Sequence, residues 1–477
     1  MAKKSDDYRP GAYELIDIRM MNSDTTETVS LTRLCVYFNL YEDIYKNCMQ
    51  ADFHLVDGQG LFSDFPINGD EVIELAYKTA SEDCELVNLL FRVYKIGPRE
   101  PVTDKSVSYT LYAVSEEAVV DNTLRVHGVY KNKPINLIAK DVFDEYLKMA
   151  SSGIDEGINI TGKPGGSQLR VEAIDALTEI TYPDGKAFSA EISKGNVKFI
   201  GNGMRPIEFI NLLASEAEGL NSKSSTFLFY ENADGYRFET IEQMGASNPV
   251  EEYIYVMKNR ELSATQKSKF LEYQKIEQLT VQPLYDNFGK LMNGVFGSKV
   301  NYFDPLTKTY RVNRYNYATE FENERHMEQF KVANERFLSR YDVAESKGIT
   351  LHSDIAQEFS QYIRSKTPGL SYRRKQNFLS KERSAKLNFE SVKMHFSIPG
   401  DSTLRVGKTF TMNLPEASGT KDKLNKDDRY LRGNFIISSL RHHINLGAEE
   451  YTTYIEGIKD SFSETLTNNP PDFDEWG

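Results

Sequence analysis

Cysteine is scarce in this sequence, and segments that direct a protein to a membrane are missing. The 477 residues include three cysteines, Cys35, Cys48 and Cys84, which are too few for a disulfide framework and are not spaced as zinc ligands. We expect three buried, reduced thiols, with a single disulfide as the alternative. No apolar run approaches the roughly 20 residues that cross a bilayer, and Met1–Pro10 lacks the apolar core of a secretory signal. These absences predict a soluble protein of a reducing compartment.

Positive charge is also in deficit. Lys and Arg number 57 against 70 Asp and Glu, a net charge of −13. This argues against a uniformly basic nucleic-acid binder, because such a protein must displace counterions from phosphates. Arg311–Arg314 and Arg373–Lys386 are the two basic concentrations. Solvated helix surface is the favoured interpretation of them, and an acidic protein partner or nucleic acid is the alternative.

Recognisable catalytic motifs are absent. There is no Gly-x-Ser-x-Gly elbow and no His-Glu-x-x-His pair, and no Gly-Lys-Ser/Thr follows Gly165-Gly166. His442 and His443 are adjacent in a predicted strand, so they face opposite sides and do not ligate one ion. A glycosidase pair could exist among so many carboxylates, but their abundance is no evidence for it. We therefore predict no catalytic, cofactor-binding or metal-binding residue, no cofactor and no enzymatic activity.

Aromatic residues are plentiful, apart from the single Trp. The chain has 28 Tyr and 27 Phe, which favour strands, and a hydrophobic fraction of 40%. A chain of this length and composition builds a substantial core, about three domains at ~150 residues each. Alternating segments with turn residues between them predict an antiparallel sandwich or barrel in the first part. The predicted strands there are Ala12–Met20, Thr28–Leu31, Leu34–Ile44, Gln50–Val56, Glu71–Ala76, Leu86–Ile96 and Ser108–Val114.

The pattern becomes mixed after Ser115. Apolar steps of three and four predict helices over Pro134–Met149 and Pro206–Ala217, and the turn Asn232–Gly235 predicts a β-hairpin. From Glu320 to Asn388 charge dominates and helical spacing returns, for example at Phe330, Val332, Phe337 and Tyr341, and at Ile355, Phe359 and Ile363. Strands resume at Glu251–Met257, and then at Val392–Ile398, Arg405–Leu414, Gly433–Ile444 and Glu450–Lys459.

Two distant segments share a pattern. Asp52–Leu75 and Lys393–Leu414 each contain a strand with a His, a Gly turn, a Leu, a second Gly (Gly69 or Gly407) and an alternating strand. The glycines permit positive φ, and the strand that follows is half buried. Duplication of a β-domain is one explanation, and chance similarity in β-rich sequence is the other.

An ordered series of segments resembles a known family. It runs through Ala12–Met20, Leu40–Asp57, Phe65–Leu75, Pro134–Leu147, Met204–Ile241 and Arg432–Asp460. The series resembles the central baseplate hub proteins of contractile-tailed bacteriophages, a tail-tube-like β-barrel hub family related to the hub part of type VI secretion spikes. Met204–Ile241 and Phe435–Asp460 are its most specific parts, and the charged stretch 320–386 departs from it.

The resemblance implies a β-rich α+β fold with two tail-tube-like antiparallel β-barrels, flanking helices and α/β side domains. The expected limits are 11–130 for the first barrel, 131–274 for an α/β side domain, 275–320 with 387–465 for a discontinuous second barrel, 321–386 for a charged, largely helical insertion and 466–477 for an acidic tail. It also favours duplication as the origin of the two similar segments.

The resemblance further implies a structural virion protein of the tail baseplate, assembled in the host cytoplasm. The expected form is a homotrimeric ring that adapts the sixfold tail tube to the threefold spike. Its expected partners are the tube protein or a tube initiator ring, the central spike and the surrounding baseplate wedge proteins. DNA would pass through the ring without specific binding. The alternatives are the hub of a non-phage contractile injection or type VI secretion system, or a tail-associated peptidoglycan-degrading enzyme.

Overall fold

The chain divides into two compact units. Unit 1 comprises Met1–Thr280, Met394–Phe410 and Ile436–Gly457, and unit 2 comprises Val281–Lys393, Thr411–Phe435 and Ile458–Gly477. The computed structural model describes residues 10–22, 28–61, 65, 67–80, 84–148, 186–255, 274–282, 286–304, 308–352, 370–414, 428 and 430–464. The Gly165-Gly166 segment, the predicted helical positions Ile355, Phe359 and Ile363, and the predicted tail 466–477 lie outside these residues.

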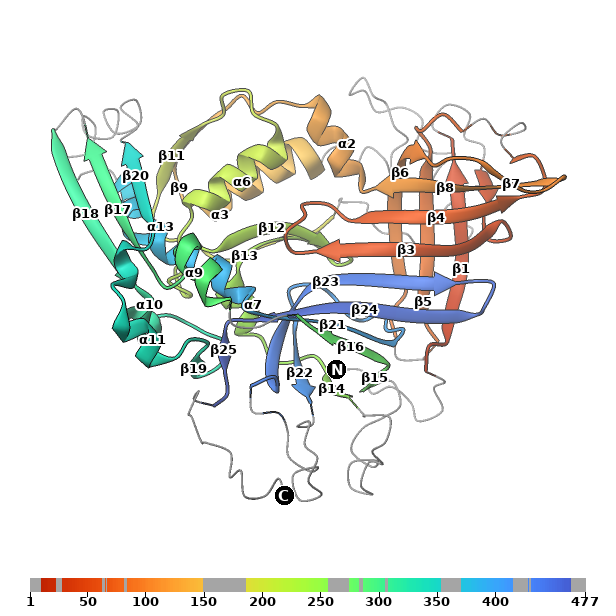
Figure 1. The fold of residues 1–477 in the computed structure, drawn as a ribbon. Coiled ribbons are helices and arrows are strands. Elements are labelled where there is room, and N and C mark those ends of the chain that lie inside the picture. Colours follow the sequence, from red (N-terminus) through yellow and green to blue (C-terminus); the bar gives the residue numbers. More distant parts are fainter. Residues whose placement is uncertain are drawn as a thin grey trace, which may run out of the picture. The chain divides into compact units, whose positions relative to one another are not determined.

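Strands dominate the described residues (Figure 1). The strands are β1 (Tyr13–Met21), β2 (Thr28–Ser30), β3 (Cys35–Asp43), β4 (Gln50–Asp57), β5 (Val72–Thr79), β6 (Val87–Ile96), β7 (Glu100–Thr103), β8 (Ser106–Val114), β9 (Val129–Lys133), β10 (Phe188–Ala190), β11 (Val197–Ile200), β12 (Phe227–Asn232), β13 (Gly235–Thr240), β14 (Glu252–Tyr255), β15 (Lys275–Ile276), β16 (Gln278–Val281), β17 (Gly297–Asp304), β18 (Thr309–Asn316), β19 (Phe330–Lys331), β20 (Gly348–His352), β21 (Val392–Pro399), β22 (Thr409–Asn413), β23 (Gly433–Asn445), β24 (Glu450–Lys459) and β25 (Ser461–Phe462).

The helices are fewer, and most are short. They are α2 (Glu116–Thr123), α3 (Ile135–Val142), which continues as the π-helix η1 (Phe143–Lys148), α6 (Pro206–Glu216), α7 (Ile241–Gly245), α9 (Asn287–Asn293), α10 (Tyr317–Glu320), η3 (Phe321–Asn323), α11 (Glu335–Arg340), η4 (Val343–Glu345) and α13 (Leu370–Phe389). None of the helices in the described ranges combines the length and the apolar character that crossing a membrane requires.

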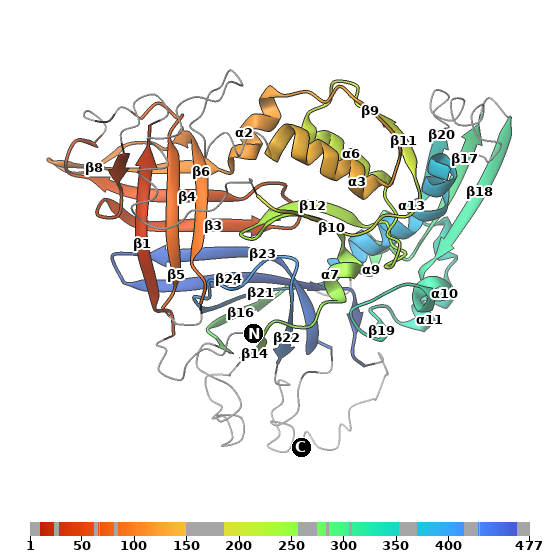
Figure 2. The same ribbon diagram turned by 180° about the vertical axis from the view of Figure 1, so that it is seen from behind.

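The first six long strands form one antiparallel set, which we call the first sheet copy. In space their order is β1-β5-β6-β8-β4-β3, with β2 beside β1 and β7 beside β8. Strands β1 and β5 run across the direction of β3 and β4 (Figures 1 and 2). Alternate residues from both groups enclose one core, in which Ile18, Phe38, Phe53, Leu75 and Leu111 are fully buried. The predicted strand positions in this part of the chain are confirmed.

A second set of six strands repeats this order. We call it the second sheet copy, and its order is β14-β22-β23-β24-β21-β16. In both copies the first strand along the chain is followed in space by the fourth, fifth, sixth, third and second. The similar segments Asp52–Leu75 and Lys393–Leu414 cover the third and fourth strands of each copy. Gly69 and Gly407 have φ of +87° and +80°, as the sequence pattern predicts. The repeat therefore extends from sequence to topology.

The predicted closed barrels are not found in the strand pairing that the structure describes. The sheet has open ends at β2, β7, β15 and β16, and no sheet in the described ranges closes into a barrel. Closing the first sheet copy would bring β3 onto β1. The free edge of β3 is instead occupied by β23, so both copies belong to one 15-stranded sheet. The prediction of a β-rich fold is confirmed.

A mixed region of unit 1 follows the first sheet copy. Helices α3 and α6 pack on each other, and α6 also packs on β12, in the sheet β10-β13-β12 (Figure 2). Their shared core includes Ile138, Phe143, Phe209 and Leu213. Pro206 lies in the first turn of α6, where its missing N–H has no intrahelical partner to lose. The two predicted helices and the hairpin are confirmed, and the end of the first helix is a π-helix.

Unit 2 contains strands that the residue pattern alone did not mark. Its sheet has the order β18-β17-β20, and α13 packs against β17 and β18. Polar residues alternate along β17, where Val300 and Tyr302 are buried, so its apolar signal is weak. Phe330, predicted to be helical, lies in β19 and pairs with Phe462 of β25. This long-range pairing overrides the local helical spacing.

Candidate functional site: the joint between two sheet copies

The two adjacent histidines, His442 and His443, lie on β23. His442 is 2% exposed and its Nδ1 lies 2.8 Å from the hydroxyl of Tyr451. Burial, with the nearby Arg405, lowers the pKa of His442 to about 3, so the ring is neutral. His443 points to the other side of β23, as expected of adjacent strand residues. No group of three or more His, Cys, Asp or Glu side chains placed to hold a metal occurs in the part of the chain that the structure describes.

The thiols are free, as predicted. Cys35 and Cys84 are buried, whereas Cys48 is only partly buried. Burial raises the pKa of Cys35 to about 12, which leaves it a poor nucleophile at neutral pH. The Sγ atom of Cys48 lies 3.5 Å from the hydroxyl of Tyr236.

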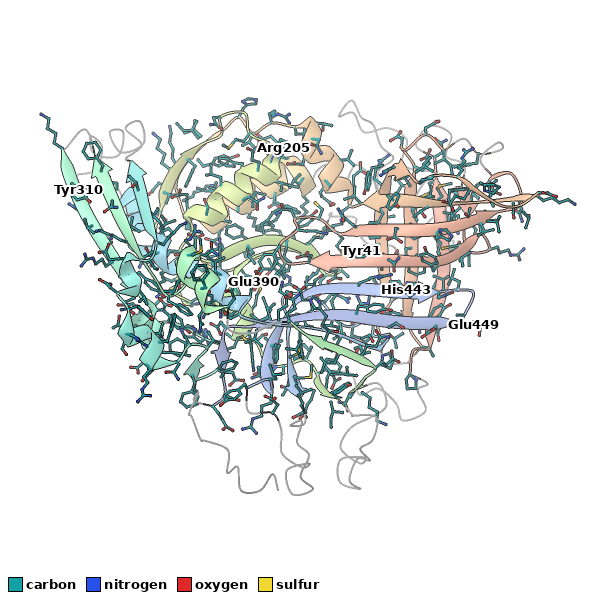
Figure 3. The ribbon with its side chains drawn as sticks, in the orientation of Figure 1. Tyr41, Arg205, Tyr310, Glu390, His443 and Glu449 are labelled. Carbon is teal, nitrogen blue, oxygen red and sulfur yellow. The ribbon has the colours of Figure 1, made fainter. Side chains whose placement is uncertain are left out.

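The best-defined polar constellation is the joint where β23 of the second sheet copy pairs with β3 of the first. The pairing is antiparallel, from Ser439 opposite Asp43 to Asn445 opposite Tyr37. Figure 3 shows Tyr41 and His443 on these adjoining strands. At the joint, residues about 400 positions apart in the sequence pair in one antiparallel β-ladder.

Asn39 is the central hydrogen-bonding group of the joint. It is 3% exposed, and its Nδ2 donates to Asp52 at 2.6 Å. Its Oδ1 accepts from Arg441 Nε at 2.9 Å and lies 2.8 Å from His443 Nδ1. Because that oxygen is an acceptor, Nδ1 of His443 carries the hydrogen. Burial and then Arg441 lower the pKa of His443, which keeps the ring neutral beside the guanidinium.

A buried carboxylate, Glu42, connects three chain segments beside the joint. Its oxygens accept from the backbone N–H of Ala233 at 3.2 Å and of Val406 at 3.1 Å. Glu42 is 1% exposed, and burial raises its pKa to about 7, although Arg405 opposes the shift. Arg405 Nε itself donates to Asp234 at 2.7 Å. The β12–β13 turn is therefore fastened to both sheet copies.

Protonation of Glu42 should make the free energy of unfolding depend on pH. The pKa of Glu42 in the folded state is raised above the usual 4.5. Its stabilising contribution to the free energy of unfolding is therefore full below pH 4.5 and is lost as the pH rises through about 7. Relative to Glu42→Gln, we expect the wild type to lose about 2 kcal/mol of unfolding free energy between pH 5 and pH 8. Urea denaturation at both values measures this. In the exposed control Glu100→Gln, the free energy of unfolding should change between the two pH values by the same amount as in the wild type. The same change in Glu42→Gln would contradict the assignment.

A second buried cluster fixes the mixed region to the β3–β4 turn. Lys186 Nζ donates to Glu117 at 2.8 Å and to Glu231 at 2.5 Å. The other oxygen of Glu231 accepts from the backbone N–H of Met49 at 2.8 Å. Burial opposes the charge of Lys186, but the two carboxylates outweigh it and raise its pKa. Burial raises the pKa of Glu117. The cluster holds four segments in one place.

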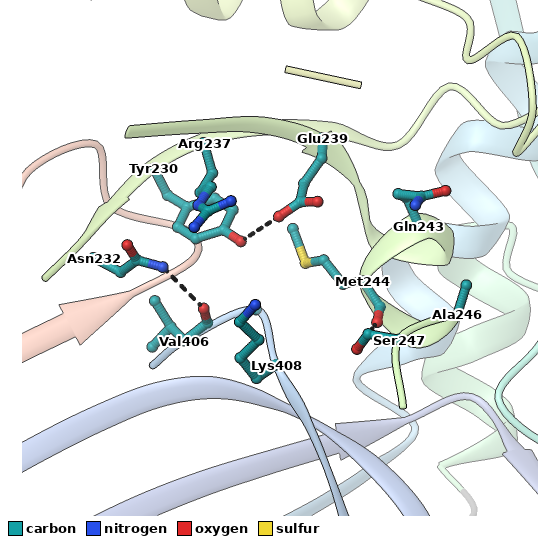
Figure 4. A pocket seen from close by; sticks show the side chains of 11 residues that line it. Tyr230, Asn232, Arg237, Glu239, Gln243, Met244, Ala246, Ser247, Val406 and Lys408 are labelled. Atoms are coloured by element: carbon teal, nitrogen blue, oxygen red, sulfur yellow. Dashed lines mark hydrogen bonds between the residues drawn. The ribbon is translucent and has the colours of Figure 1, made fainter. Parts of the chain in front are cut away.

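A small polar cavity lies where the β12–β13 hairpin faces the loop before β22 (Figure 4). Its volume is about 140 Å³, and Tyr230, Arg237, Glu239 and Lys408 are among the residues that line it. Tyr230 donates to Glu239 at 2.7 Å. Pockets for small-molecule ligands usually measure ~300–1,000 Å³, so this cavity has room for water rather than for a substrate. Ser247, which also lines it, donates its hydroxyl hydrogen to the backbone carbonyl of Met244 at 2.7 Å.

The comparisons with known proteins found similarity in structure. No family model and no curated protein matches the sequence. A tail protein from Neisseria meningitidis is 11% identical, covers 94% of this chain and 97% of its own, and has a TM-score of 0.49. The 43 kDa tail protein of a Shewanella oneidensis prophage is 7% identical, with coverages of 93% and 98% and a TM-score of 0.47.

Two further solved structures belong to related systems. A prophage tail protein from Listeria monocytogenes is 8% identical, with coverages of 93% and 95% and a TM-score of 0.44. An Escherichia coli component of the type VI secretion system is 9% identical, with coverages of 90% and 74% and a TM-score of 0.39. These solved structures are described as tail or prophage tail proteins and as a type VI secretion component.

Sequence reasoning did not single out the residues that define the joint. Asn39, Glu42 and Lys186 stand alone among ordinary polar residues, and their partners are between 13 and 404 positions away. Gly407 is the exception, because its place in the repeated pattern marks it.

Proposed function

We propose that this chain is the structural hub of a phage-type tail baseplate, a homotrimer without catalytic activity that joins a sixfold tail tube to a threefold central spike. The observation that carries the proposal is the repeated strand order, because one chain holds two copies of the same sheet joined edge to edge. Three such chains present six related sheets in a ring with true threefold symmetry. A ring of this kind matches both symmetries.

The expected partners follow from this geometry. The pseudo-sixfold face would receive the tube protein or its initiator ring, the threefold face would receive the spike, and wedge proteins would surround the hub in the virion. The domain limits form part of the same proposal: 11–130 and 275–320 with 387–465 carry the tube-like domains, 131–274 the side domain and 321–386 an insertion. The second sheet copy departs from these limits, because its first strand, β14, lies within 131–274, and β17 and β18, within 275–320, pair in a separate sheet. The insertion enters between the second and third strands of the second sheet copy, where the first sheet copy has the short β3–β4 turn.

Net charge supports a passive conduit. The chain carries −13, and an acidic wall repels the phosphates of passing DNA, so that the genome slides without adhering. Electrostatic repulsion of this kind needs no base contacts and no cofactor. Assembly of the hub would take place in the host cytoplasm before the particle is complete.

The first test is the mass of the purified chain. Light scattering should give three times the 54.5 kDa of one chain, and negative-stain images should show rings with a central hole. The same preparation should leave purified peptidoglycan intact. A compact monomer that degrades peptidoglycan would contradict the proposal and support the tail-associated enzyme.

A further inference from the structure

The strand pairing at the joint between the two sheet copies predicts one further pairing of the same kind. Within the chain, the second strand of the first copy, β3, pairs with the fifth strand of the second copy, β23. Applied in the other direction, the second strand of the second copy, β16, should pair with the fifth strand of the first copy, β6. No such pairing occurs among the described residues of a single chain: β16 pairs only with β21.

The edge of β6 that corresponds to the joint is open. β5 covers the first half of β6, up to Arg92 opposite Val72, while β8 pairs with the second half from Arg92 to Ile96. β7 continues this line and pairs with β8 alone. In β23 the corresponding half, from Ser439 onward, is the part that β3 covers. The two copies thus differ: β3 pairs with this edge of β23, whereas no strand pairs with the corresponding edge of β6 among the described residues.

The open edge displays two apolar side chains beside the exposed, charged Lys95 and Glu100. Tyr94 on β6 is 52% exposed and Val102 on β7 is 55% exposed. Exposed strand edges are templates for pairing with another chain, and proteins usually block them with charges or proline. Pro101, in β7, has no N–H to donate. A strand with one donor fewer disfavours long, nonspecific pairing, while the two apolar side chains remain available to a specific partner.

In the described part of the chain, β16 also has one unpaired edge, and its short length suits the β6–β7 edge. The strand is short, and Gln278 and Thr280 are exposed while Leu279 is partly buried. One side of the strand is held to β21, with the backbone N–H of Glu277 donating to Ser397 at 2.9 Å. The other side faces away from the sheet and, within the described residues, carries no strand. Its length suits a short ladder of the kind that the β6–β7 edge permits.

We propose that β16 of one chain pairs antiparallel with the β6–β7 edge of a second copy of this chain, so that the joint between chains repeats the β3–β23 joint within the chain. The contact is head-to-tail, because each chain contributes one edge of each kind. Head-to-tail contacts form a ring when the rotation closes. The inference rests on the proposed trimeric hub and identifies its subunit interface.

Cysteine pairs across the predicted joint test the interface. The full chain carrying Gln278→Cys is mixed with the full chain carrying Val102→Cys, and a short bis-maleimide cross-linker is added. We expect covalent dimers in the mixture and none with either variant alone. In the chain that carries both substitutions, we expect covalent species up to the trimer. The matched control replaces Val102→Cys with Val129→Cys, which is 53% exposed on β9 and should yield no product with Gln278→Cys.

A charge variant provides a second measurement that does not depend on cross-linking. Tyr94→Asp with Val102→Asp changes two exposed side chains, so the circular dichroism and unfolding midpoint should stay as in the wild type while the assembly mass falls to that of one chain. A wild-type trimer that does not cross-link in the mixture and tolerates both aspartates would overturn this interface but leave the trimer intact. A wild-type chain that stays monomeric at every concentration would overturn both proposals.

Discussion

Replacing Lys186 with methionine should lower the free energy of unfolding by about 3–5 kcal/mol. Lys186 is the only cation bonded to Glu117 and Glu231 in the described residues, and all three side chains are nearly inaccessible to water. Methionine fills a similar volume but leaves two buried carboxylates facing each other without a counter-charge. Urea denaturation at pH 7 measures the loss.

Two variants separate this effect from ordinary loss of a lysine. Lys194→Met removes an ion pair with Glu218 in which the lysine is 55% exposed, and exposed pairs contribute roughly 0–1 kcal/mol. Adding Glu117→Gln and Glu231→Gln to Lys186→Met should recover part of the stability, because no uncompensated charge then remains. A triple variant as unstable as Lys186→Met alone would show that the lost volume or hydrogen bonds, rather than the charges, cause the destabilisation.

Gly407→Ala should destabilise the chain by about 2–5 kcal/mol, clearly more than Gly69→Ala. Both glycines have left-handed φ, and an L-residue there costs roughly 1–2 kcal/mol. A Cβ at Gly69 meets no atom within 4 Å, whereas a Cβ at Gly407 would overlap the hydroxyl of Tyr230. Tyr230 is 1% exposed and bonded to Glu239, so overpacking adds about 1–3 kcal/mol.

The pair is matched because the two glycines occupy the same place in the two sheet copies. The difference between their unfolding free energies therefore reports the packing of the second copy against the β12–β13 hairpin. Equal losses in the two variants would mean that Tyr230 moves aside freely and that the contact contributes little. Thermal unfolding of the two alanine variants beside the wild type gives the comparison.

The sequence predicts the strands well where their burial alternates. Burial alternates along β4 and along most of β8, and α6 begins at Pro206, as the sequence predicts. β5 was predicted from its alternating sequence, although nearly all of its residues are buried. β17 and β18 lie in the range 275–320, which the resemblance alone assigned to a β-domain. The residue pattern did not reveal them, because β17 buries only two apolar side chains, Val300 and Tyr302. Phe330 was assigned to a helix because its spacing fits one, whereas its partner Phe462 is 132 positions away.

The candidate site was harder to predict than the fold. The similarity of Asp52–Leu75 and Lys393–Leu414 pointed to a repeat, but it gave no indication that β3 would accept β23 instead of closing a barrel. Edge pairing depends on which strand ends meet in space, and no local pattern encodes that. Asn39 illustrates the problem: its two donors, Arg441 and His443, come from the far end of the chain.

We propose that one chain supplies two copies of the same sheet to a threefold ring. Cryo-electron microscopy of the purified chain, reconstructed without imposed symmetry, tests it most directly. We predict a closed ring of three chains with six similar sheets around a central opening, alternating between joints within a chain and joints between chains. A monomer, or a ring in which each chain contributes a single sheet, would contradict the account.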